Sequence, residues 1–235
     1  MVLVKDPKFA EGLGLEVQIR TKLVRFWSYI KSAAIRIGDD VLELEGVPAS
    51  AEDGQETNYW INLHHQGELK SIGGFPVTLH KASHARRYLT IDLDSRFPGQ
   101  KIVLGTYKEF VKVDFVNASE ETFGKSVGML GDFVTGKTLA RDGSTELHSF
   151  SKLGQEWQVL PTEDMLFRNT ENPQFPKKCI EPEDPQGQRR RRLAESSITE
   201  ETAEAACASL KDDIDRRACV YDILATQDLG MVGAY

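Results

Sequence analysis

The stretch Gly128-Met129-Leu130-Gly131-Asp132-Phe133 is followed by Leu139-Ala140-Arg141-Asp142-Gly143 and then by Gly154-Gln155-Glu156-Trp157. It contains glycines, acidic residues and a tryptophan, and it lies at the end of a region with many strand patterns. Asp142-Gly143 is typical of a turn, because glycine adopts backbone angles that other residues avoid. The stretch therefore closes a domain whose fold is predicted by the residues before it.

Strand patterns dominate the chain from its start to about residue 160. Leu15 to Arg20 alternates apolar and polar residues, which places its apolar residues, Leu15, Val17 and Ile19, on one face of a strand. Ile35 to Ile37 and Val41 to Glu45 flank Gly38-Asp39-Asp40, a pattern that predicts a β-hairpin. Three more strands are predicted at Leu89 to Asp94, Ile102 to Leu104 and Phe110 to Phe115. Turns are predicted at Gly73-Gly74, Pro98-Gly99 and Asp142-Gly143. Short strands with regular turns favour a mainly β, antiparallel sandwich over a parallel α/β sheet.

The size and charge of the chain exclude several classes of protein. With 235 residues, it can form one substantial core with an appendage, or two small domains. Its 29 basic and 36 acidic residues give a net charge of −7, which argues against a general nucleic-acid binder. No run approaches the ~20 apolar residues of a transmembrane helix. We therefore expect neither a nucleic-acid partner nor a membrane span.

The composition changes after Trp157. Residues 161–197 are rich in proline and poor in apolar residues, which predicts a linker that lies on the surface or is disordered. The linker contains the run Arg189, Arg190, Arg191 and Arg192. In a secretory protein this run resembles a dibasic-type processing site, whereas a solvated charge run is an equally good interpretation. Contact with an anionic surface is a third and weaker one.

Helix patterns follow the linker. Ser197-Ile198-Thr199-Glu200 fits a capping box, and Ala203, Ala206, Cys207 and Leu210 recur at helical spacing. Lys211 to Asp213 predicts a turn, and Ile214 to Ala225 predicts a second helix. Residues 198–226 are therefore expected to form a helical hairpin, with residues 227–235 as a tail.

The chain has three cysteines, Cys179, Cys207 and Cys219. Cys207 and Cys219 would face each other across the predicted hairpin, where a disulfide is worth roughly 2–4 kcal/mol. In an oxidising compartment the odd count leaves Cys179 unpaired here, or paired with a residue outside this chain. In a reducing cytosol the same three residues would be ordinary small apolar side chains. Composition leaves both compartments open.

The stretch from Gly128 to Trp157 resembles the closing segment of a von Willebrand factor type D domain, an extracellular β-rich module. The usual family signature is Cys-Gly-Leu-Cys-Gly-Asn, an acidic loop, an Asp-Gly turn and a Trp-bearing last strand. The resemblance covers about residues 1–160 and implies an antiparallel sandwich without its N-terminal strand, because the Gly-Asp-Pro-His opening of the family is missing. Leu139 to Gly143 and Cys219 to Thr226 are most similar to divergent versions in cell-surface proteins of algae and diatoms.

The resemblance also bears on cysteine chemistry. Val127 and Leu130 occupy the two cysteine positions of the family signature, so the family's thiol exchange is not expected here. A cysteine just past the closing Trp commonly pairs with one in an early strand of the family. The resemblance gives this role to Cys179 and places its partner upstream of Met1, as in a fragment of a longer secreted protein. The helices that carry Cys207 and Cys219 resemble the cysteine-bearing segment that often follows a type D domain.

The same resemblance implies a metal and a modification. Type D domains commonly bind calcium in this loop, which points to Asp132, Asp142 and Thr135 as ligands. Ca²⁺ takes about six to eight oxygen ligands, and this loop offers fewer acidic residues than usual. Asn117-Ala118-Ser119 is an N-glycosylation sequon.

No catalytic motif or histidine metal site is predicted. His64 and His65 are adjacent, so on a strand they point to opposite faces. His80 and His84 would share a helix face, but they lack cysteine or acidic partners for zinc. Nucleophile elbows, phosphate loops and dinucleotide-binding glycine motifs are missing from the sequence. We therefore expect exposed histidines and a non-enzymatic protein.

The function expected from these observations is that of an extracellular structural or adhesive module of a cell-surface or matrix protein. It would act through contact with a protein or glycan partner, and the signal peptide would lie outside this sequence. One alternative is an accessory type D domain of a lipid-carrier protein. Another is an intracellular enzyme with an unrecognised site, which three free thiols would favour.

Overall fold

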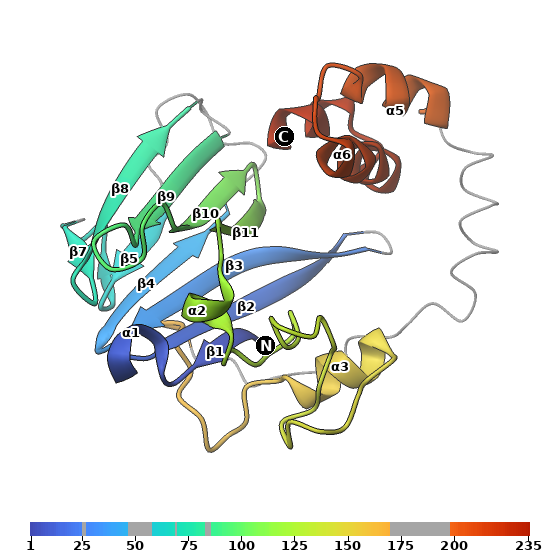
Figure 1. Cartoon of the computed structure of the whole chain (residues 1–235). Helices are drawn as coiled ribbons and strands as arrows, with labels where there is room; N and C mark the ends of the chain where they lie inside the picture. Colours follow the sequence, from blue (N-terminus) through green and yellow to red (C-terminus); the bar gives the residue numbers. More distant parts are fainter. Residues whose placement is uncertain (25–26, 47–57, 69, 83–85, 170–197) are drawn as a thin grey trace. The chain divides into compact units, whose positions relative to one another are not determined.

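The computed structural model describes residues 1–24, 27–46, 58–68, 70–82, 86–169 and 198–235. Two compact units are distinguished, one formed by Met1–Thr21 with Ile30–Cys179 and the other by Lys22–Tyr29 with Ile180–Tyr235. The first, here called the sandwich unit, contains most of the β-structure (Figure 1). The second, here called the helical unit, contains the helices near the C-terminus.

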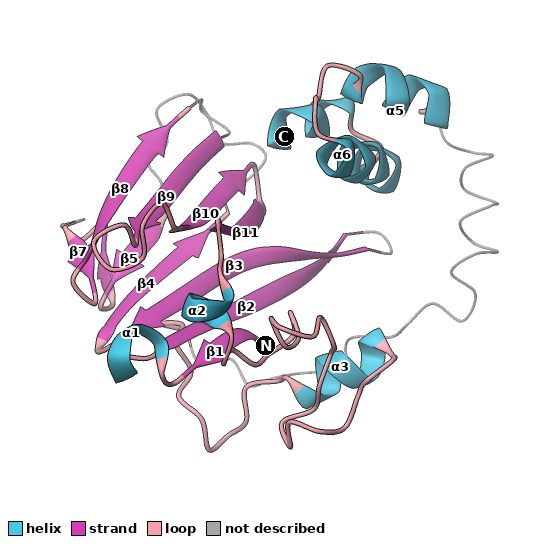
Figure 2. Ribbon diagram, in the orientation of Figure 1, coloured by secondary structure: helices cyan, strands magenta, loops and turns pink. Residues whose placement is uncertain are grey.

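The strands form two antiparallel sheets (Figure 2). The first sheet has the order β1-β2-β3-β4-β5-β6 and the second has the order β11-β10-β9-β8-β7. The strands of the first sheet are β1 (Val2–Asp6), β2 (Leu15–Val24), β3 (Trp27–Ile37), β4 (Asp40–Glu45), β5 (Tyr59–Ile61) and β6 (His64–His65). Those of the second are β7 (Ser71–Ile72), β8 (Phe75–Lys81), β9 (Arg86–Asp92), β10 (Lys101–Tyr107) and β11 (Phe110–Val116). The predicted mainly β class with antiparallel pairing is confirmed.

One hydrophobic core contains side chains from both sheets. Ile35 and Leu42 of the first sheet and Leu89 and Leu104 of the second are fully buried. Burying each such side chain contributes about 1.5–3 kcal/mol. In β9, Leu89 and Ile91 are buried while Thr90 is only half-buried, as the alternation predicts. The result is a sandwich-like arrangement of two sheets.

The predicted hairpin is present between β3 and β4. Ile37 pairs with Asp40, so Gly38 and Asp39 form a two-residue turn. Gly38 has a φ of 61°, a conformation that glycine adopts without strain. The Asp40 side chain then accepts a hydrogen bond from Gly73 N at 2.9 Å, which ties this turn to the turn between β7 and β8.

The strand expected at Gly154 to Trp157 is wrong. Residues Phe150–Glu156 form helix α3, and Trp157 follows as its C-cap. Leu153 and Trp157 are both buried and lie four residues apart, so helical geometry turns them to the same side. The Trp157 Nε1 group donates to Leu139 O at 3.0 Å. The last strand that the structure describes ends at Val116, earlier than predicted. The shorter helices α1 (Phe9–Gly12) and α2 (Glu120–Phe123) also belong to this unit.

Residues 158–169 cover the outer side of β2 instead of starting a linker at residue 161. Gln18 is fully buried, and its side chain donates to Asp164 O at 2.8 Å and accepts from Leu166 N at 3.0 Å. Leu166 and Phe167 pack against Ala34 of β3. Both sides of β2 are therefore buried, which the alternating sequence does not predict.

The helical unit contains α5 (Glu200–Cys207), α6 (Asp213–Thr226) and the 3₁₀ helix η1 (Leu229–Ala234). The two predicted helices are present, but α5 begins later than the predicted capping box: its N-cap is Thr199, which accepts a hydrogen bond from Thr202 N. Ser197 lies outside the described residues. Asp212 caps α6 by accepting from Ile214 N and Asp215 N.

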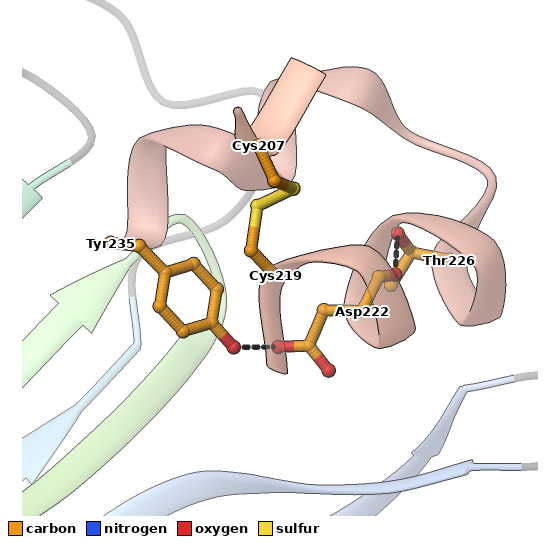
Figure 3. Close-up of a disulfide and its surroundings, with 5 residues drawn as sticks. All are labelled: Cys207, Cys219, Asp222, Thr226 and Tyr235. Carbon is orange, nitrogen blue, oxygen red and sulfur yellow. Dashed lines mark hydrogen bonds between the residues drawn. A yellow bond between two sulfur atoms is a disulfide. The ribbon is translucent and has the colours of Figure 1, made fainter. Parts of the chain in front are cut away.

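A disulfide joins Cys207 to Cys219, as predicted, with a Cα–Cα distance of 6.1 Å (Figure 3). Both cysteines are fully buried. One turn along α6, the Asp222 carboxylate accepts a hydrogen bond from Tyr235 Oη at 2.7 Å, which folds the tail back onto the helix. Burial raises the pKa of Asp222, although its hydrogen bonds act in the opposite direction.

Candidate interaction surface

The Gly128 to Phe133 segment lies along β1, the edge strand of the first sheet. Val127 and Lys5 exchange both backbone hydrogen bonds, at 2.7 and 2.8 Å. Met129 N donates to Val2 O, and Leu130 N donates to Leu3 O, each at 3.2 Å. The segment therefore occupies backbone groups that an edge strand would otherwise present to other chains.

The glycines of this segment permit the close approach. Gly128 has a φ of 138°, and a Cβ atom there would lie 2.4 Å from Leu3 O. Gly131 has a φ of 86°, and a Cβ there would lie 2.6 Å from Lys137 O. A larger residue would clash with backbone at either position, so the glycines specify the shape of this loop.

The loop holds four large apolar side chains at the surface. Their exposed fractions are 38% for Val127, 58% for Leu130, 42% for Phe133 and 52% for Val134. We call these four residues the apolar loop surface. Apolar groups gathered in this way mark candidate contact sites for other molecules, because removing them from water is favourable.

A chain of aromatic rings connects this surface to the core. The Phe133 and Phe123 ring centroids lie 6.3 Å apart, and those of Phe123 and Phe9 lie 5.9 Å apart. Phe123 and Phe9 are buried at 3% and 1% exposed. Phe133 is therefore anchored on one side by packed rings while its other side faces solvent.

Arg141 connects α3 to Glu163, a role that the sequence does not reveal. Its guanidinium forms a two-pronged ion pair with Glu163, at 2.6 and 3.1 Å, and lies 4.9 Å from the centre of the Trp157 ring. Its Nε donates to Glu156 O at 2.9 Å. Burial alone would raise the pKa of Glu163, but the hydrogen bonds from Arg141 and Leu160 N outweigh it and lower that pKa.

The predicted calcium ligands Asp132, Thr135 and Asp142 lie in two separate turns. The Asp132 carboxylate accepts from both the backbone N and the hydroxyl of Thr135, at 2.7 and 2.6 Å. Asp142 accepts in the same way from Ser144 N, Thr145 N and the Thr145 hydroxyl in a separate turn. These hydrogen bonds lower the pKa of both aspartates. Each carboxylate thus stabilises its own turn. The described ranges contain no cluster of three or more His, Cys, Asp or Glu residues that could hold a metal ion.

The predicted glycosylation residue lies on the surface. Asn117 is exposed directly after β11, and its side-chain amide donates to Gly99 O at 2.9 Å. Ser119, the third residue of the sequon, is the N-cap of α2 and accepts from Thr122 N. A glycan would replace one of the two hydrogens on this amide nitrogen.

The histidines are placed only partly as expected. His64 and His65 are exposed on the two-residue strand β6, and the His65 ring lies 5.2 Å from that of Trp60. His80 is on strand β8, so the helix expected around it is wrong. His84 lies outside the described residues, as do Cys179 and the run Arg189, Arg190, Arg191 and Arg192.

No family model matches the chain, and no curated protein matches it. Within the described residues, the structure has no helix that is both long and apolar enough to cross a membrane.

Proposed function

We propose that this chain is a non-enzymatic extracellular module, of the von Willebrand factor type D kind, that contacts a protein or glycan partner at a cell surface or in a matrix. The observation that carries the proposal is the apolar loop surface. Val127 and Leu130, which stand at the two signature cysteine positions, are both exposed and lie on a backbone that is fixed against β1. A surface that is pre-formed loses little conformational entropy on binding.

Two other observations are consistent with this proposal. The disulfide between Cys207 and Cys219 is typical of proteins that fold in an oxidising compartment. The sandwich-like pair of antiparallel sheets is the architecture that a type D domain requires. Calcium binding at Asp132, Asp142 and Thr135 stays a separate prediction, because the proposed contact is apolar and does not use their oxygen atoms.

The test compares binding by the full chain and by the double variant Leu130→Ser/Phe133→Ser. Fluorescently labelled protein is applied to a glycan array and to an array of extracellular proteins. We expect the wild-type chain to bind a subset of spots and the double variant to lose about 10-fold or more in affinity, since each side chain contributes roughly 1–2 kcal/mol when buried.

The matched control is Phe150→Ser. Phe150 is 90% exposed but is the first residue of α3 and lies outside the apolar loop surface. It should bind like the wild type. Equal binding by all three proteins would refute the role of the loop. Turnover of substrate in a hydrolase activity panel would instead support the alternative of an enzyme.

A further inference from the structure

The helical unit has a groove of about 550 Å³ between α5 and α6. One rim is acidic and carries Glu200 and Glu204, which lie four residues apart and therefore on one side of α5. The other rim is basic and carries Arg216 and Arg217 of α6. The groove thus presents opposite charges along its two sides.

These charges are not neutralised across the groove. Within the described part of the chain, Glu200 and Glu204 have no ion-pair partner, and the carboxylate that pairs with Arg216 is Asp213 of the same helix. The Arg217 Nε group donates to the backbone oxygen of Asp213 at 3.2 Å. The acidic rim is therefore available to a cation from outside the helical unit.

Between the rims the groove is apolar. Val220 and Leu224 are four residues apart on α6 and both are only half-buried, and Tyr221 beside them is 42% exposed. Among the residues of this unit that the structure describes, the fully buried part is small and consists mainly of Ala203, the disulfide, Ile223 and Met231. A unit with so small a core gains stability when a second surface covers its remaining apolar groups.

We propose that this groove binds the same groove of a second copy of the chain and forms a two-fold symmetric dimer. A two-fold axis that runs along the groove places the acidic rim of each copy against the basic rim of the other, so the same favourable contact forms twice. A uniformly acidic or basic partner would meet a rim of its own sign. The charges of the groove therefore match a second copy better than they match a partner of single charge.

Sedimentation equilibrium of the full chain tests this dimer. We expect a monomer–dimer equilibrium for the wild type that weakens as salt is added, because the rim charges are exposed. Glu200→Lys/Glu204→Lys makes both rims basic, and Arg216→Glu/Arg217→Glu makes both acidic. Each double variant should dimerise about 100-fold more weakly, since like charges then face each other.

A mixture of the two double variants gives the decisive result. An all-basic groove should pair with an all-acidic one, so the mixture should form a heterodimer while each variant alone stays monomeric. Glu201→Lys is the matched control, because Glu201 is exposed on α5 but does not line the groove, and its self-association should be unchanged. Circular dichroism shows whether every variant keeps its helices.

Three outcomes would overturn the proposal. The first is a wild-type chain that remains monomeric at every concentration. The second is a charge-reversed mixture that does not associate, although its members are folded. The third is a dimer that is lost in Leu130→Ser/Phe133→Ser but kept in both groove variants. That last result would assign self-association to the sandwich unit, and it would leave the proposed binding role of the apolar loop surface intact.

Discussion

The sandwich unit and the helical unit are stabilised by different interactions. The sandwich unit buries residues such as Ile35, Leu42 and Leu104 completely, between two sheets. The described residues of the helical unit include few large buried side chains, and a disulfide connects α5 to α6. The difference illustrates a general relation: a chain segment too short to bury much apolar surface needs a covalent or intermolecular supplement.

The largest expected effect comes from the core of the sandwich unit. Ile35→Ala should lower the free energy of unfolding of this unit by about 2–5 kcal/mol, because it leaves a cavity at a fully buried position. Hydrogen exchange resolved by peptide measures the effect, and amides of β9 and β10 should exchange faster. Ile35→Val, expected to cost about 0.5–1.5 kcal/mol, is the graded control. If the amides of α6 responded equally, the two units would unfold together and the comparison would fail.

The disulfide is the next largest contribution, and it acts on the other unit. Cys207→Ala/Cys219→Ala should destabilise the helical unit by about 2–4 kcal/mol. Without the disulfide no loop is closed between the two positions, so the unfolded chain regains conformational entropy. Amides of α5 and α6 should exchange faster, while those of β9 and β10 keep their wild-type rates. Unchanged exchange in α5 and α6 would show that the buried apolar side chains suffice without the covalent link.

A smaller effect is expected at the polar layer that attaches residues 158–169 to β2. Gln18→Ala should cost about 1–3 kcal/mol, because it removes the acceptor of Leu166 N and the donor to Asp164 O. The control Gln155→Ala removes an exposed side chain of α3 and should stay within about 0.5 kcal/mol of the wild type. Thermal melting monitored by circular dichroism compares the two variants. If Gln18→Ala left the melting temperature unchanged, water would have replaced both hydrogen bonds.

The smallest effect concerns the pH dependence of the helical unit. Because burial raises the pKa of Asp222 above its ordinary value of 3.8, the folded state binds more protons than the unfolded state between the two pKa values. The stability of this unit therefore falls as pH rises through that window. Asp222→Asn removes the effect and still offers Tyr235 an acceptor. The variant should be more stable than the wild type at neutral pH, and the advantage should shrink in acid. A pH-independent difference would assign the effect to packing.

Much of the fold could be predicted from the sequence, because its signals are local. Alternation of apolar residues predicts β2, β9 and β11, and Gly38-Asp39 predicts the turn of the hairpin. Helical spacing brings Cys207 and Cys219 together, and the disulfide is confirmed. The strand predicted at Trp157 is wrong because four residues without periodicity do not distinguish the last turn of a helix from a strand.

The candidate surface was predicted only in part. The glycines and acidic residues identify the segment that carries it, and the structure adds that both aspartates stabilise turns. The exposure of Leu130 and Phe133 could not be derived from sequence, because it depends on which distant segments pack beside the loop. The connection that Arg141 makes between α3, Glu163 and the Asp142 turn has no signal in the sequence.

The sequence by itself determined the elements whose cause lies within a few residues: strands β2, β3, β4, β9, β10 and β11, the two-residue turn and the two disulfide-bonded helices. The tertiary structure decided which faces are covered. Gln18 is buried only because Leu166, distant in sequence, crosses β2, and Val127 to Leu130 is fixed only because β1 has an edge to pair with. Local conformation follows from local sterics, whereas burial depends on which distant segment fills the space beside a residue.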